Sequence, residues 1–114
     1  MKLQIEGQKL RIRIDEDELA RLLAGNTIDM RTTFADAFAI RFALRATKDD
    51  GVKFVGQADA WQIGLPDADL RAHAARLPTR DGLRYTLPGT ATADALELLF
   101  DVDVRDSMRH RRSS

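Results

Sequence analysis

The chain has 114 residues, no cysteine and two histidines, and its 18 basic residues are balanced by 18 acidic ones. This length favours one domain with its own core, and the lack of cysteine excludes a disulfide framework, a thiolate zinc site and a cysteine nucleophile. The zero net charge argues against nucleic acid as a partner. Because no apolar run approaches the ~18 residues of a membrane span and no signal-peptide core is present, we expect a cytoplasmic protein of bacterial type without membrane contact.

The first half of the chain begins with a predicted hairpin. Apolar and polar residues alternate over residues 9–14, which is typical of a half-buried strand, and the glycine–glutamine pair at 7–8 fits a two-residue turn. Asp15 is expected to cap a helix, with Glu18 three positions on completing a capping box. The helix carries a leucine stripe, and the alternation of a strand returns over residues 39–45.

The second half repeats this order of elements. An Asp-Asp-Gly turn at residues 49–51 joins the halves, and Pro66 opens a second helix that is expected to stop at Pro78. Alternation returns over residues 98–104 and predicts the last strand. Residues 105–114 have no apolar periodicity, and we expect them to form a basic, frayed tail.

The two halves, residues 2–46 and 52–104, keep a constant register within each element. The offset is 49 for the first strand, 51 for the second strand and the helix, 55 for the third strand and 56 for the fourth. An offset that grows only between elements is the behaviour of a duplication with loop insertions, so the sequence predicts a repeated ββαββ unit. Representative pairs are Leu3/Val52, Ile5/Phe54, Ile12/Ile63, Leu19/Leu70, Met30/Tyr85 and Phe42/Leu98.

These elements predict a single α+β domain over residues 1–104. We expect an eight-stranded antiparallel sheet, strongly curved or closed into a barrel, with both helices packed on it. Two helices of roughly ten residues span only ~15 Å and cannot cover eight strands, which favours closure or a dimer. The predicted core consists of Ile12, Leu19, Leu23, Phe42, Trp61, Ile63, Leu70, Leu98 and Phe100.

The polar strand faces carry a positive excess that the net charge hides. Nine basic residues (Lys2, Lys9, Arg11, Arg13, Arg31, Arg41, Arg45, Lys53 and Arg84) stand against five acidic ones (Glu6, Asp29, Glu97, Asp101 and Asp103). One interpretation is a solvated face with weak cross-strand ion pairs. The other is a basic surface for an anion. The residues selected for such a site are Arg11, Arg13, Arg41, Arg45, Arg84 and Lys53.

Other chemical signals support no site. The acidic run from Asp15 to Glu18 lacks the glycine and ligand spacing of a calcium loop and suits the first turn of a helix. His73 has no recognisable nucleophile partner and is predicted to lie on a helix surface. The glycines are scattered singly, so no phosphate loop is present. We therefore assign no catalytic residue, no metal ligand and no cofactor.

The opening stretch, Met1-Lys2-Leu3-Gln4-Ile5-Glu6-Gly7-Gln8-Lys9-Leu10-Arg11-Ile12-Arg13-Ile14-Asp15, resembles the start of a small family of uncharacterised bacterial proteins. Members of that family begin with a similar basic hairpin. They end with a Leu-Glu-Leu-Leu-Phe-like strand, which corresponds to residues 96–100 here. The resemblance covers most of the chain and implies no function.

The duplicated order of elements is also similar to the triphosphate-tunnel (CYTH-like) superfamily. The resemblance implies an eight-stranded barrel whose lumen binds triphosphate through basic residues and a metal through glutamates. Members of that superfamily start with a Glu-x-Glu-x-Lys strand, whereas residues 4–9 keep one acid and displace the lysine. This departure puts phosphohydrolase activity in doubt, since fold analogy alone does not transfer function.

The sequence therefore favours a small non-enzymatic binding or interaction protein whose ligand is phosphorylated or otherwise anionic. A divergent phosphohydrolase of the tunnel type is the first alternative, and a structural homodimer that pairs through an exposed sheet edge is the second. Carboxylates converging inside a tunnel would favour the enzyme, and a basic lumen without acids would favour binding. An apolar sheet face left open would favour the homodimer.

Overall fold

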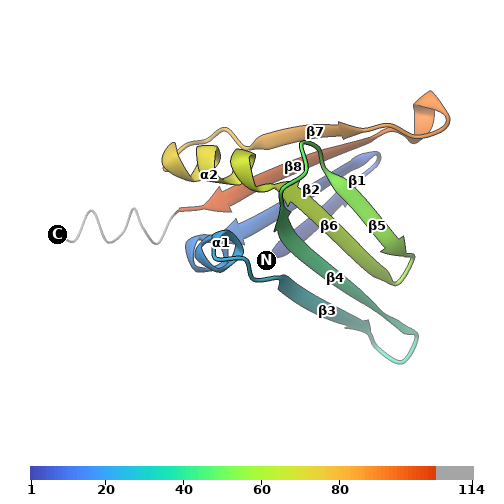
Figure 1. Ribbon diagram of the computed structural model, residues 1–114. Coiled ribbons are helices and arrows are strands. Elements are labelled where there is room, and N and C mark those ends of the chain that lie inside the picture. The colour runs from blue at the N-terminus through green and yellow to red at the C-terminus, as the bar shows by residue number, and fades with distance from the viewer. Residues whose placement is uncertain (105–114) are drawn as a thin grey trace. The chain divides into compact units, whose positions relative to one another are not determined.

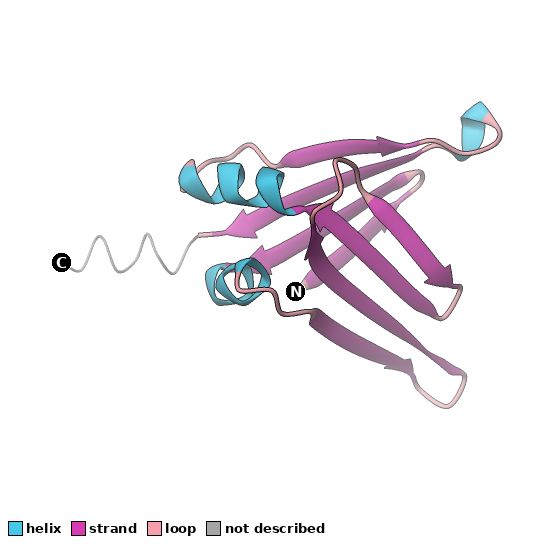
Figure 2. Ribbon diagram, in the orientation of Figure 1, coloured by secondary structure: helices cyan, strands magenta, loops and turns pink. Residues whose placement is uncertain are grey.

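A computed structural model of the chain describes residues 1–104, so the predicted tail at 105–114 lies outside the described residues. Eight strands, two α-helices and one 3₁₀ turn follow one another in the order that Figures 1 and 2 show. The strands are β1 (Lys2–Glu6), β2 (Lys9–Asp15), β3 (Ile28–Phe34), β4 (Phe38–Thr47), β5 (Lys53–Gln57), β6 (Ala60–Pro66), β7 (Leu83–Leu87) and β8 (Leu96–Asp103). The helices are α1 (Glu16–Leu23) and α2 (Asp67–Ala75), and the 3₁₀ turn is η1 (Thr92–Asp94).

The strands form two mixed sheets of four. Sheet A has the order β1-β2-β8-β7 and sheet B the order β3-β4-β6-β5. Within each sheet, two antiparallel hairpins meet at a central parallel pair, β2 with β8 or β4 with β6. The expected single antiparallel sheet or barrel is therefore wrong, because each sheet keeps two edge strands and does not close. Alternation reports which face a residue occupies but carries no information on which strand lies next to it.

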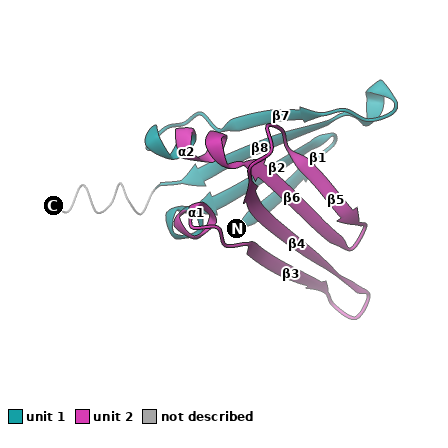
Figure 3. Cartoon of the chain, in the orientation of Figure 1, with its two compact units in different colours: residues 1–19, 73–114 teal, residues 20–72 magenta. Residues whose placement is uncertain are grey.

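The chain divides into two compact units that do not coincide with its sequence halves. Unit 1 contains residues 1–19 and the chain from residue 73 onward, and unit 2 contains residues 20–72 (Figure 3). Sheet A lies in unit 1 and sheet B in unit 2, with the unit boundaries inside α1 and α2. Each sheet thus takes one hairpin from each half of the sequence.

The pairing registers of the two sheets correspond. In sheet A, Ile12 lies opposite Phe100, and in sheet B, Ile63 lies opposite Leu44. Ile12 and Ile63 differ by 51 positions, and Leu44 and Phe100 differ by 56. These are the offsets that the sequence predicts for the second and fourth strands, so the parallel ladders of both sheets have the same register.

The first strand does not follow its predicted offset. Leu3 lies opposite Ile12 and Phe54 lies opposite Ile63, so Leu3 corresponds to Phe54 and not to Val52. The observed offset is therefore 51 rather than 49. A shift of two residues keeps every side chain on its face of a strand, and alternation by itself cannot detect it.

The predicted turn and cap are both present. Gly7 begins the turn between β1 and β2 with φ +56°, a conformation that favours glycine. The Glu18 N–H donates to Asp15 Oδ1 at 2.7 Å, and the Asp15 N–H donates to Glu18 Oε1 at 3.1 Å. This reciprocal pair is the predicted capping box, and the Met1 amino group also donates to the Glu18 carboxylate at 2.9 Å.

Most of the predicted core is buried, with two exceptions, and the buried residues outside the predicted list include one histidine. Leu23 and Trp61 are only half-buried, while the other predicted core residues are buried. His73 is 1% exposed, so its predicted place on a helix surface is wrong. It lies three residues after the fully buried Leu70 in α2, and residues at that spacing share one helix face. No helix among residues 1–104 is long and apolar enough to cross a membrane.

Replacing Phe42 or Phe100 by alanine is expected to lower the free energy of unfolding by about 3–5 kcal/mol, because both rings are almost completely buried. Phe38→Ala is the matched control, since that ring is 59% exposed and stacks on Phe34. It should cost less than about 1.5 kcal/mol. Chemical denaturation measures all three, and equal losses would contradict the assignment of the buried faces.

Candidate functional site

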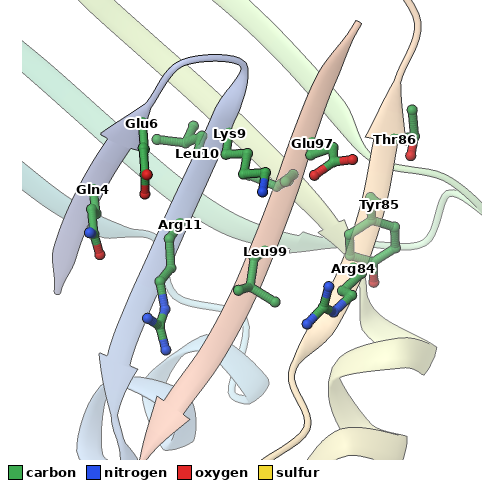
Figure 4. A pocket seen from close by; sticks show the side chains of 11 residues that line it. Gln4, Glu6, Lys9, Leu10, Arg11, Arg84, Tyr85, Thr86, Glu97 and Leu99 are labelled. Atoms are coloured by element: carbon green, nitrogen blue, oxygen red, sulfur yellow. The ribbon is translucent and has the colours of Figure 1, made fainter.

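The polar face of sheet A contains a groove of about 390 Å³ that crosses all four strands. One row of this face runs from Gln4 through Arg11 and Leu99 to Arg84. Arg11 and Arg84 lie on either side of Leu99 (Figure 4). Arg84 makes no hydrogen bond or ion pair with the residues that the structure describes, but an apolar side chain separates it from Arg11.

The two remaining sheet A candidates, Arg11 and Arg13, share one carboxylate. Arg11 donates to Asp101 Oδ2 from Nη2 at 2.6 Å and from Nε at 2.9 Å, and Arg13 Nε donates to Asp101 Oδ1 at 2.9 Å. Burial by itself raises the pKa of Asp101, but the hydrogen bonds and charges of Arg13 and Arg11 outweigh it and hold the pKa below its ordinary value. Both guanidinium groups of this cluster are therefore already bound to the Asp101 carboxylate.

The polar face of sheet B is different. A depression of about 590 Å³ crosses β3, β4 and β6, with Ala43 and Ala60 among the residues that line it. Arg31 and Arg41 lie directly opposite each other on adjacent antiparallel strands and both line the depression. Both are exposed, and neither side chain forms a hydrogen bond or ion pair with any residue from 1 to 104. Gln62 supplies an amide on the same face.

The other two sheet B candidates extend this positive face. Arg45 is exposed, and its guanidinium has no ion pair within residues 1–104. Lys53 Nζ lies 3.4 Å from a carboxylate oxygen of Asp49, but both side chains are largely exposed, so this pair contributes little. The six predicted residues thus divide between the two sheets, three on each.

Arg31 was not among the selected candidates, although it lies on the same face. The sequence placed it on a polar strand face, but its significance comes from Arg41 directly across the ladder. That pairing depends on the register of β3 with β4. Alternation in the sequence indicates that Arg31 lies on the polar face, but it does not indicate which residue of the next strand lies beside it.

The sheet A groove and the sheet B depression occupy equivalent positions of their sheets. When the sequence offsets 51, 55 and 56 are applied, each of the nine residues that line the depression corresponds to a residue that lines the groove. Charge differs at these positions: Arg41 corresponds to Glu97, and Asp29 corresponds to Arg84. The remaining correspondences are Met30/Tyr85, Arg31/Thr86, Phe42/Leu98, Ala43/Leu99, Ala60/Lys9, Trp61/Leu10 and Gln62/Arg11.

Sorting the polar-face charges by sheet shows where the positive excess lies. The polar face of sheet A carries five basic and five acidic residues within its strands, which are Lys2, Lys9, Arg11, Arg13, Arg84, Glu6, Asp15, Glu97, Asp101 and Asp103. Sheet B carries four basic residues and one acidic residue, which are Arg31, Arg41, Arg45, Lys53 and Asp29. The positive excess therefore belongs to sheet B.

His73 is one of two buried titratable residues among the described residues, together with Glu18. Neither ring nitrogen has a hydrogen-bond partner within residues 1–104, and the ring packs edge-on against Phe100 with centroids 6.2 Å apart. Burial lowers the pKa of His73, the charge of Arg76 lowers it further, and Asp101 acts in the opposite direction. Residues 1–104 contain no cluster of three or more histidine, aspartate or glutamate side chains that could hold a metal.

Comparison with known proteins identifies one family. The model described as "Family of unknown function (DUF7009)" matches residues 1–105, which is almost the whole chain. No curated protein matches the chain.

Protonation of His73 is expected to destabilise the fold in mild acid. Its folded pKa lies below the ordinary value of 6.5, so the unfolded chain binds more protons between that folded pKa and 6.5. The free energy of unfolding should therefore have its full value above about pH 6.5, and it should fall as the pH drops below 6.5. Denaturation at about pH 7 and pH 5 measures this slope.

His73→Leu should flatten that slope, since leucine does not titrate. The second histidine, His110, is present in both proteins and cancels in the comparison. Asp101 adds no slope in this window because its folded pKa is depressed below 3.8. An equal slope in both proteins would contradict a buried, neutral His73.

Proposed function

This chain belongs to the family of unknown function DUF7009, and we propose that it is a non-enzymatic binding protein for a small anionic ligand. The binding site is the depression on the polar face of sheet B, with Arg31 and Arg41 as the residues that contact the anion. Arg45 and Lys53 extend the positive charge around it.

The observation that carries this proposal is the pair of unneutralised arginines. Like charges directly opposite each other on an antiparallel ladder are destabilising, and their Cβ atoms lie only about 4.5–5.5 Å apart. Arg31 and Arg41 occupy such positions without an acid bound to either within residues 1–104. An anion placed between them converts this repulsion into two attractions.

The chemistry of the site suits phosphate or a related oxyanion. A guanidinium presents parallel N–H donors that match two oxygens of a phosphate, and two guanidinium groups can hold one phosphoryl group from both sides. Ala43 and Ala60 are small, so the lining leaves space for a ligand. Gln62 and Asp29 line the same depression and can bind hydroxyl groups next to the phosphate.

The equivalent groove of sheet A does not offer this charge. Glu97 stands in the position of Arg41, and Thr86 stands in the position of Arg31. In the next row, Asp101 binds both arginines of β2, while its counterpart on sheet B is Arg45. These differences favour one anion site and not two.

The correspondence of the grooves supports the duplication that the sequence offsets predict. Matching ladders and matching lining positions are what two copies of one ββαββ unit would produce after each contributed one hairpin to each sheet. We infer that the two faces then diverged in charge.

The phosphohydrolase alternative needs converging acids to hold a metal. Asp29 is the one acid on the polar face of sheet B within the described residues, and it stands among four basic side chains. No observation favours hydrolysis over binding, so the proposal is limited to binding.

Millimolar pyrophosphate or triphosphate is expected to raise the melting temperature. A ligand at roughly ten times its Kd adds about 1.4 kcal/mol, which corresponds to a rise of roughly 5–10 °C for a domain of this size. The shift should shrink as sodium chloride is raised, because added salt screens the arginines. Differential scanning fluorimetry over a series of phosphates measures it.

Arg41→Gln should remove that response, since it takes one of the two guanidinium groups away. The matched control is Arg84→Gln, which changes the same residue type on the face of sheet A and should leave the response intact. No shift in the unaltered protein with any phosphate, or an equal loss in both variants, would overturn the sheet B site.

A further inference from the structure

Strand β1 is an exposed edge of sheet A. It pairs with β2 on one side only, and every residue from Lys2 to Glu6 except Leu3 is exposed. Ile5 is 63% exposed, the largest exposure among the large apolar side chains of residues 1–104. An edge strand with free backbone groups and an uncovered isoleucine is a surface to which another strand can add.

The sequence of β1 is complementary to itself when read in the antiparallel sense. We propose that β1 pairs with β1 of a second copy of this chain, about a two-fold axis at Gln4. Lys2 then lies opposite Glu6 of the second copy, and Glu6 lies opposite its Lys2. Leu3 and Ile5 lie opposite each other across the interface, so the exposed isoleucine gains an apolar neighbour.

The backbone favours the same arrangement. A two-residue hairpin places the residues that flank the turn, Glu6 and Lys9, in a hydrogen-bonded pair, and such pairs alternate along the ladder. The N–H and C=O groups of Leu3 and Ile5 therefore point away from β2. In the proposed register Leu3 faces Ile5 of the second copy, so the free groups of both strands meet.

The charges within the sheet leave both ends of β1 in need of a partner. Lys2 lies opposite Arg13, a like charge, and has no ion pair within residues 1–104. The carboxylate of Glu6 makes no ion pair with the described residues, although Lys9 lies opposite it. A carboxylate from the second copy beside Lys2 offsets the repulsion from Arg13.

Other registers and other edges fit less well. A shift of β1 by two residues in either direction separates the lysine from the glutamate, and β5 and β7 contain no acid at all. Strand β3 has a charge-matched register centred on Met30, but it would place Asp29 of the second copy beside Arg31 and neutralise the proposed anion site. Pairing through β1 leaves sheet B free.

The dimer should be weak, because a five-residue strand buries less than the roughly 1,200 Å² that stable complexes commonly bury. Sedimentation-velocity runs of the full chain over micromolar to millimolar concentrations should therefore show a reversible monomer–dimer equilibrium. The test uses charge exchange: Lys2→Glu and Glu6→Lys each place like charges opposite each other at both ends. Each single variant should dimerise about tenfold more weakly.

An equimolar mixture of the two single variants should recover association, because Glu at position 2 of one then faces Lys at position 6 of the other. The double variant K2E/E6K should also recover it. Lys53→Glu is the matched control, since it reverses the charge of a lysine on an edge strand of sheet B. This variant should dimerise as the unaltered chain does.

Three results would overturn the proposal. The first is a chain that remains monomeric at every concentration, and the second is a pair of single variants whose mixture does not recover association. The third is a loss of dimerisation in Lys53→Glu, which would place the interface on sheet B. Circular dichroism of each variant separates loss of pairing from loss of folding.

Discussion

The parallel pair at the centre of each sheet is the constraint on which the rest of this structure depends. It joins β2 to β8 and β4 to β6, and therefore brings together hairpins from different halves of the sequence. Parallel neighbours cannot be linked by a tight turn. In sheet B residues 48–52 connect the two hairpins, and in sheet A the chain passes through α1, the strands of sheet B and α2 between them. The pair also fixes which side chains form one row across a polar face, and thereby which charges neutralise each other.

One row illustrates how much depends on this register. In sheet A it places Arg13 next to Asp101, whose second oxygen binds Arg11. In sheet B the equivalent row places Gly64 next to Arg45, so the residue beside Arg45 supplies no carboxylate. Two sheets with the same backbone pattern thus have opposite electrostatic outcomes. The difference between a structural ion cluster and a positively charged surface lies in single residues at equivalent positions.

Two open sheets also leave four edge strands in place of the closed arrangement expected from the order of elements. Edges with free N–H and C=O groups need protection, and natural sheets often use charged side chains or covering segments for it. In the proposed pairing of β1, a second copy of the strand satisfies its charges. The β1 edge and the basic face lie on different sheets, so the proposed association and the proposed ligand binding do not compete for the same side chains.

The sequence by itself determined what depends on neighbours along the chain. The reciprocal Asp15–Glu18 cap, the Gly7 turn and the burial of Phe42 and Phe100 all follow from short-range spacing, because caps, turns and strand faces are set within a few residues. Only the tertiary structure decided the division into two mixed sheets, the burial of His73 and the opposition of Arg31 to Arg41. A period of two fixes a side chain's face but not its partner strand, and partner strands are chosen by contacts between residues far apart in the sequence.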